Sequence, residues 1–398
     1  MNRRFQLAVV ASSTCVVLLL LFGAVHGRSA STDNPYNHLG VYSEVLARIK
    51  ADYVEEPDMK AVTLGAINGM LESIDPYASY LNADQYKQYL QAKQTNKASV
   101  GLVLSKRMGY VGIVDVVPGS AAAKAGLTTG DVVESIKNVS TRDMPLAFAE
   151  ILLQGDPGSS VDVSVLRVRK AEPQKITLIR AAVEYPAVSG RLVTDQGPTP
   201  VGVIQTMTLG PGRVKDVATK ITDLEKQGAK RFILDLRHCA TGGPDEGIAL
   251  ANLFLDKGLI AYSQGQKMSR QDYQAVASKA ITKLPLVVIT DRGTADAAEV
   301  AAAALLDSKR AEVVGERTYG DAAIRKAVTL DDGSAVILSV AKYYSPSGKS
   351  IQDNGVTPNV PQAEIADTVE DDSIPDAPDA PAQKPGVDEL MRRAYEIK

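Results

Sequence analysis

The order of apolar and amphipathic segments in the second half of the chain constrains the fold most strongly. Residues 286–290 form an apolar run, a polar glycine turn follows, and residues 297–306 are rich in alanine, which predicts a buried strand, a turn and a helix. Upstream, the apolar run 201–204 precedes the amphipathic segment 214–227 in the same order. Strands that alternate with helices are typical of a layered α/β structure with a largely parallel sheet, which we predict for residues 187–360.

A second strand and turn of this kind lies between these two. The apolar run 232–236 enters a glycine turn at Gly242 and Gly243, and a helix is predicted for residues 247–255. In α/β proteins, ligands bind in the crevice outside the carboxyl ends of the strands. The turn that follows residue 290 is therefore expected to hold a side chain at such a crevice.

Length and charge limit the class of protein. The chain has 398 residues, of which 45% are hydrophobic, so two domains with additional short segments are expected. Its formal net charge of -3 offers no basic surface of the kind that binds nucleic acid. The two cysteines, Cys15 and Cys239, leave no intramolecular disulfide if the N-terminal segment is removed. We expect no cofactor and no metal ion.

The N-terminus has the pattern of an export signal. Arg3 and Arg4 precede an apolar run over residues 7–25, and such a pattern directs a chain out of the cytoplasm. The run is long for a cleaved signal and just long enough to span a bilayer, so cleavage near Gly27 and retention as a membrane anchor are both open. We assign residues 1–30 to this segment and expect the rest to be periplasmic or anchored to the inner membrane.

Two stretches before the α/β region resemble parts of a PDZ domain. Residues 119–131 read GSAAAKAGLTTGD, similar to the G-S-P-A-x-x-A-G-L-x-x-G-D pattern of such domains, and Ser99, Val100, Gly101 and Leu102 stand where they have a carboxylate-binding loop. Backbone N–H groups of this loop capture the terminal carboxylate of a peptide, and the next strand pairs with the peptide. These four residues are the predicted peptide-carboxylate site.

Two further motifs point to a family of peptidases. Residues 293–300 read GTADAAEV, and residues 320–325 read GDAAIR. From about residue 36 to 360, the chain resembles the C-terminal processing, or tail-specific, serine peptidases, whose corresponding motifs are similar to S-A-S-A-S-E and G-K-G-x-V-Q. The resemblance implies that Asp296 stands at the serine nucleophile, Asp321 at the lysine base and Arg325 at the glutamine that orients the base.

The resemblance also implies an architecture. It consists of an α/β peptidase core of the ClpP/crotonase-like layered type, an inserted PDZ domain and an N-terminal helical region. We place the helical region at residues 31–97, the PDZ domain at 98–185 and the tail-specific-protease-like core at 186–363. Residues 364–398 are predicted to form an acidic, Pro-rich linker and a short C-terminal helix.

Replacement of all three side chains removes the expected chemistry. A serine attacks a carbonyl only when a base takes its proton, and a lysine is that base only when its pKa is lowered. Two carboxylates at these positions must share a proton, bind a cation or be neutralised. We interpret Asp296, Asp321 and Arg325 as an ion cluster that fills an inactive site, with an aspartic-type acid/base dyad as the alternative.

The turn after residue 236 bears on the same site. Residues 237–243 read RHCATGG, and the resemblance to the family pattern R-G-N-P-G-G gives Thr241, Gly242 and Ala297 as the equivalents of the oxyanion donors. Main-chain N–H groups still suffice for that role, although a Cβ at Thr241 restricts the backbone where glycine could take a positive φ. In this alignment, His238 replaces a glycine.

Two residues are candidates for an unconventional nucleophile. Cys239 lies beside His238, and Thr294 lies in the turn of Asp296. Neighbours just after a strand usually point in different directions, and catalytic Cys and His normally come from distant positions. A buried, inert thiol is the alternative interpretation of Cys239.

Three classes of function follow from these patterns. We favour an exported pseudoprotease that binds peptide or protein C-termini through its PDZ domain, with a homodimer or an active paralogous peptidase as possible partners. An active endopeptidase with an unconventional nucleophile and a purely structural scaffold are the alternatives. No nucleic acid is expected as a partner, and the membrane is expected to be contacted only through the N-terminal segment.

Overall fold

The computed structural model describes residues 38–94, 98–107, 109–142, 144–167, 172–363 and 388–397. The predicted export segment and most of the predicted acidic linker lie outside these ranges. The chain divides into two compact units, Met1–Gly65 and Ala66–Lys398. No helix within the described ranges is long and apolar enough to cross a membrane.

The predicted N-terminal helical region is confirmed over its described part. It contains α2 (Leu39–Asp52), α3 (Met59–Glu72) and α4 (Ala83–Gln94). Asp58 starts α3, because its carboxylate accepts hydrogen bonds from two backbone N–H groups of the first turn. A three-residue strand that the sequence did not indicate, β1 (Ser79–Leu81), precedes α4.

The predicted PDZ domain is an antiparallel sheet with two helices. Its strands lie in the order β2-β3-β4-β6-β7, with β5 beside β4. The bounds are β2 Leu102–Arg107, β3 Tyr110–Val116, β4 Val132–Ile136, β5 Val139–Ser140, β6 Ser160–Leu166, β7 Gln174–Ile179, α5 Ala121–Lys124 and α6 Leu146–Leu153. Because β2 is an edge strand with α6 against it, one edge of β2 is available to pair with an added strand.

A six-stranded sheet in the order β17-β14-β13-β10-β9-β8 forms the centre of the core. Its strands are β8 Ser189–Val193, β9 Val201–Gln205, β10 Arg231–Asp235, β13 Leu286–Thr290, β14 Ala311–Gly315 and β17 Val360–Pro361. All neighbours are parallel except β8 and β9, which confirms the predicted α/β layers.

Three helices cover one face of this sheet with a continuous apolar core. They are α7 (Arg213–Lys226), α8 (Pro244–Asn252) and α9 (Ala297–Asp307). The prediction for α8 was shifted by three residues, because Pro244 occupies the first turn of the helix, where its fixed φ suits a helix start and its missing N–H has no cost.

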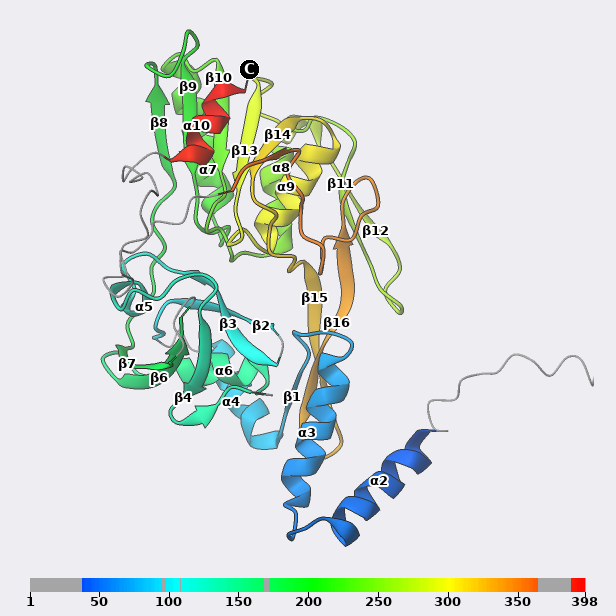
Figure 1. Ribbon diagram of the computed structural model, residues 1–398. Helices are drawn as coiled ribbons and strands as arrows, with labels where there is room; N and C mark the ends of the chain where they lie inside the picture. The colour runs from blue at the N-terminus through cyan, green and yellow to red at the C-terminus, as the bar shows by residue number, and fades with distance from the viewer. Residues whose placement is uncertain are drawn as a thin grey trace, which may run out of the picture. The chain divides into compact units, whose positions relative to one another are not determined.

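The predicted C-terminal helix, α10 (Glu389–Glu396), packs on the other face of the sheet (Figure 1). Its buried side chains are Leu390, Met391 and Ala394. Two arginines hold its ends. Arg237 pairs with Asp388 at the start of the helix, with 2.8 Å between the Arg237 Nη2 and Asp388 Oδ2 atoms. Arg231 donates hydrogen bonds to the carbonyl oxygens of Tyr395 and Ile397 at its end.

A third sheet connects parts of the chain that are distant in sequence. It contains β1-β16-β11-β12, with β15 also paired with β16; the bounds are β11 Leu259–Gln264, β12 Gln271–Gln274, β15 Ala323–Thr329 and β16 Ala335–Tyr344. Figure 1 shows β15 and β16 as a long hairpin. The fully buried Leu81 of β1 packs with Ala147 of α6 and Ile337 of β16.

Candidate functional site

Asp296 lies in the turn between β13 and α9. Its backbone φ is 53° and its ψ is -121°, a conformation that costs a non-glycine residue about 1–3 kcal/mol. A strained strand-to-helix turn is also the device by which α/β hydrolases expose a nucleophile. The turn thus presents one side chain at the start of α9, as predicted, and that side chain is a carboxylate.

The surroundings of Asp296 favour its protonated form. Burial raises the pKa of this carboxyl well above its ordinary value, and the negative charges of Asp321 and Glu299 raise it further. Arg325 lowers it. None of the ion pairs found among the residues that the structure describes includes Asp296, so its charge has no direct partner there.

Within the predicted three-residue cluster, the ion pair forms between Arg325 and Asp321, and the charges of both act on Asp296. The Arg325 Nη2 atom donates to Asp321 Oδ1, and the guanidinium lies 4.1 Å from the centre of the Tyr77 ring. No hydrogen bond between the Asp296 and Asp321 carboxyl groups is found among the residues that the structure describes, whereas an aspartic-type dyad shares a proton between its two carboxyl groups.

Glu299 joins the two loops of the site. It is fully buried, and its carboxylate accepts hydrogen bonds from the backbone N–H groups of Asp296 at 3.2 Å and of Gly320 and Asp321 at 2.8 Å. The Thr318 hydroxyl donates to it as well. Burial raises the pKa of Glu299 to about 7, and hydrogen bonds oppose that rise. A single side chain thereby fixes the turn of Asp296 relative to the loop of Asp321.

The predicted oxyanion turn lies beside the turn of Asp296, since the backbone N–H of Ala295 donates to the Cys239 carbonyl oxygen at 3.0 Å. Gly242 has a φ of 147°, and a Cβ there would lie 2.6 Å from the Leu209 carbonyl oxygen, so only glycine fits. Thr241 is not among the residues with positive φ. This agrees with the restriction that the Cβ of Thr241 was expected to impose on the backbone.

Neither candidate for an unconventional nucleophile is placed for attack. Cys239 has no exposed surface, and burial raises the pKa of its thiol well above the ordinary value. Thr294 is also fully buried. Its hydroxyl lies 2.9 Å from the Leu236 carbonyl oxygen and from a carboxylate oxygen of Asp291, where it stabilises the turn.

His238 makes contacts that the sequence did not predict. Its Nδ1 lies 3.0 Å from the Asp115 carboxylate on β3, and its Nε2 lies 3.5 Å from the Asp291 carboxylate. The backbone N–H of His238 also donates to Asp291, at 3.2 Å. Both ring nitrogens are thus engaged by carboxylates, and the imidazole does not serve Cys239 as a base.

The start of β2 presents backbone groups at the free edge of its sheet. The backbone N–H of Val117 donates to the Gly101 carbonyl oxygen at 2.9 Å, and Leu102 lies opposite Val116. In an antiparallel ladder, this arrangement makes Leu102 and Val116 a pair without mutual hydrogen bonds. The N–H and C=O groups of Leu102 therefore point to the free edge of β2.

One member of the predicted carboxylate loop needs correction. The N–H of Ser99 donates to the Ala181 carbonyl oxygen at 3.0 Å, so it is not available to a ligand. Gly101 has a φ of 83°, and a Cβ there would lie 2.2 Å from the Ser120 Cβ, which requires glycine. The candidate donors are thus Val100, Gly101 and Leu102.

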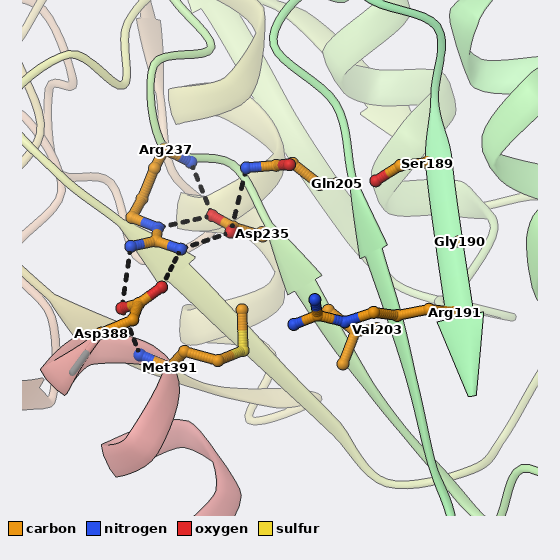
Figure 2. A pocket seen from close by; sticks show the side chains of 9 residues that line it. All are labelled: Ser189, Gly190, Arg191, Val203, Gln205, Asp235, Arg237, Asp388 and Met391. Carbon is orange, nitrogen blue, oxygen red and sulfur yellow. Dashed lines mark hydrogen bonds and ion pairs between the residues drawn. The ribbon is translucent and has the colours of Figure 1, made fainter. Parts of the chain in front are cut away.

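A separate cavity of about 400 Å³ lies between α10 and the sheet. Figure 2 shows Arg191 of β8 and Met391 of α10 on its walls, and the ion pairs of Arg237 with Asp235 and Asp388 at one end. None of the predicted site residues lines this cavity.

Comparison with known proteins agrees with the fold. The model of peptidase family S41 matches residues 200–362, and a PDZ domain model matches residues 112–167. The carboxy-terminal processing protease CtpA of Bacillus subtilis (strain 168) is 31% identical over 90% of this chain and 76% of its own length. The chain belongs to peptidase family S41.

Other members of peptidase family S41 agree with this assignment. The carboxyl-terminal-processing protease of Synechocystis sp. is 32% identical, over 82% of this chain and 76% of its own length. The solved structure of a photosystem II D1 C-terminal processing protease matches with a TM-score of 0.68 and 29% identity, over 80% of this chain and 86% of that chain. The predicted family and the predicted combination of an α/β core with a PDZ domain are confirmed.

Proposed function

We propose that this member of peptidase family S41 is catalytically inactive and binds peptide or protein C-termini through its PDZ domain. The observation that carries the proposal is Asp296, which occupies the strained turn at the start of α9. A carboxyl group that favours its protonated form there is a poor nucleophile. The turn has the shape that presents a reactive side chain but lacks the hydroxyl.

The position expected for the base supports the same conclusion. A base must be free to accept the proton of the nucleophile, whereas the Asp321 carboxylate is held by the guanidinium of Arg325. The buried thiol of Cys239 and the buried hydroxyl of Thr294 provide no replacement. Active chemistry with an unconventional nucleophile is therefore the weaker alternative.

A reversion experiment tests inactivity. We expect the unaltered protein to leave an unstructured protein with an apolar C-terminus intact, and the triple variant Asp296→Ser, Asp321→Lys, Arg325→Gln to show weak turnover. Adding Gly242→Ala to the triple variant serves as the matched control and should abolish that turnover, because the new Cβ collides with the Leu209 carbonyl. Turnover by the unaltered protein that disappears in Cys239→Ala would replace the proposal with cysteine chemistry.

The PDZ domain supports the binding part of the proposal. The donors of Val100, Gly101 and Leu102 precede an edge strand, which is the arrangement for capture of a terminal carboxylate and addition of an extended peptide. Such contacts give an affinity on the order of micromolar, because ordering a flexible peptide offsets much of the contact energy.

A pair of peptides distinguishes this function from a structural scaffold. We expect a peptide with an apolar last residue and a free C-terminal acid to bind more tightly than its C-terminal amide, by about tenfold or more, because charge-assisted hydrogen bonds are lost. Calorimetric titration of both peptides measures the difference. Equal affinity would favour the scaffold.

We further propose that the chain is exported, on the basis of the basic and apolar pattern of residues 1–30. Cell fractionation of the full-length protein, with and without Arg3→Glu and Arg4→Glu, tests this proposal and distinguishes a cleaved from an anchored form.

Sedimentation of the purified protein, alone and with an active family member, tests the proposed homodimer and paralogous partner.

A further inference from the structure

We propose that His238 is a proton-dependent clasp that holds the β2–β3 face of the PDZ domain on the turns of the inactive site. Within the unit Ala66–Lys398, His238 follows β10, Asp115 lies on β3 and Asp291 follows β13. One imidazole therefore connects the PDZ domain with two turns of the core. This proposal does not depend on whether peptides bind to the PDZ groove.

Most of the contact between the PDZ domain and these turns is insensitive to pH. Val114 of β3 is buried with Ala240 and Ala295 of the core, and apolar burial does not change with protonation. The hydroxyl groups of Ser105 and Tyr319 form a second polar contact, which involves neither a carboxylate nor an imidazole.

Two carboxyl groups outside the clasp also titrate near neutral pH, because desolvation raises the pKa of Glu150 on α6 and of Glu299 in the core to about 7. Variants of His238 and Asp115 must therefore assign a pH response to the clasp.

The two carboxylates make the charge of His238 important. Asp115 and Asp291 are each 2% exposed, and burial of a charge is costly unless it is compensated. Burial is the main cause that raises the pKa of Asp115, and the charge of Asp291 raises it further, whereas the hydrogen bond from His238 lowers it. An imidazolium donates at both ring nitrogens, and a neutral imidazole donates at only one.

Other ionisable groups around the imidazole do not replace its charge. The thiol of Cys239 and the hydroxyl of Tyr185 have raised pKa values because of burial, and both stay neutral near pH 7. The neighbouring Arg237 is paired with Asp235 of β10 and with Asp388 at the start of α10. The exposed Arg292 forms its ion pair with Glu316.

The sign of the pH dependence follows from these environments. Docking brings one further carboxylate, Asp115, to the imidazole, since Asp291 lies with His238 on the core, and burial raises the pKa of the Asp115 carboxyl, so the docked state favours bound protons. The contact is therefore strongest in acid and weakens as the pH rises through the range of about 6 to 8, in which histidine loses its proton. Uptake of one proton changes the docking equilibrium by at most about tenfold per pH unit.

Energy transfer between two dyes measures docking directly. Cysteines introduced at Val139 on the PDZ domain and Val276 on the core, which are 48% and 46% exposed, carry the dyes, in a Cys15→Ser background; Cys239 is buried and does not react. We expect the ratio of docked to undocked protein to fall at least about threefold between pH 6 and pH 8. His238→Gln should dock weakly at both pH values, and His238→Lys, which keeps a cation, should lose the pH response.

Matched variants make the result decisive. The chain has three histidines, and His38→Gln, outside the clasp, should leave the response unchanged. Asp115→Asn changes the clasp on the PDZ domain and should also remove the pH response. This variant provides the test if circular dichroism shows that His238→Gln is misfolded. A constant transfer efficiency in the unaltered protein, or a pH response that persists in a folded His238→Gln or Asp115→Asn variant, overturns the proposal.

Discussion

Asp296 combines a strained backbone with a buried carboxyl group. Replacement by asparagine keeps the shape of the side chain and removes its charge. Because the pKa of Asp296 is raised in the folded protein, the folded state loses stability as the pH rises above the ordinary carboxyl range of about 4. We expect Asp296→Asn to match the unaltered protein at pH 4 and to be more stable at pH 8, as measured by urea unfolding. The exposed Asp331→Asn is the control, and lower stability of Asp296→Asn at pH 8 would show that the charged form is the favoured one.

Glu299 differs from Asp296 because its carboxylate accepts hydrogen bonds from three backbone N–H groups and one hydroxyl. In Glu299→Gln, the new NH2 group faces backbone N–H groups that need an acceptor. Each buried donor left without a partner costs about 1–3 kcal/mol, so we expect the free energy of unfolding to fall by about 2–4 kcal/mol. Denaturant titration at pH 8 checks this against the exposed control Glu184→Gln. A loss below about 0.5 kcal/mol would mean that the two loops do not depend on this side chain.

Which side chains pair with one another was harder to predict than which residues belong to the site. The sequence indicated a carboxylate at residue 296 and a neutralising Arg325, because both follow from local motifs. It did not show that Arg325 would form its ion pair with Asp321 rather than with Asp296, since this pairing depends on the path of the loop. Nothing in the sequence connects His238 with Asp115, which is 123 residues away. The final glutamate of the turn motif was the one available signal for Glu299.

Among the elements, α10 is the helix whose position depends most on its ends. The Asp388 carboxylate accepts a hydrogen bond from the Met391 N–H at 2.9 Å and pairs with Arg237. We expect Asp388→Ala to lower the free energy of unfolding by about 1–2 kcal/mol through loss of the cap, and to speed amide exchange in α10. Glu396→Ala, which removes only exposed ion pairs, should change stability by less than about 1 kcal/mol. Equal exchange in the two variants would contradict a role for the cap.

Three central strands of the core followed directly from the sequence. Residues 201–204, 232–236 and 286–290 were predicted as strands because they are apolar runs, and β9, β10 and β13 confirm all three to within one residue at each end. Strand β1 was not predicted, since three residues carry no periodic signal. Its pairing with β16 is a tertiary property.

At the scale of the whole molecule, the cluster around Leu81 brings β1, α6 of the PDZ domain and β16 of the core together. Truncation of a fully buried leucine costs about 2–5 kcal/mol, depending on how far the site can collapse. We therefore expect Leu81→Ala to lower the free energy of unfolding by about 2–5 kcal/mol. Thermal or urea unfolding measures this change. Leu90→Ala, on the exposed side of α4, is the control and should cost less than about 1 kcal/mol. Similar losses in both variants would show that the cluster does not unite these elements.

The pairing of Ser79 with Ile337 also has a consequence for biosynthesis. Ribosomes add about 5–20 residues per second, so β1 is made roughly 10–50 s before the segment of β16 that it pairs with. During that interval the backbone groups of β1 lack the partners that β16 provides, and Leu81 lacks Ile337. The third sheet can therefore close only after β16 has been made.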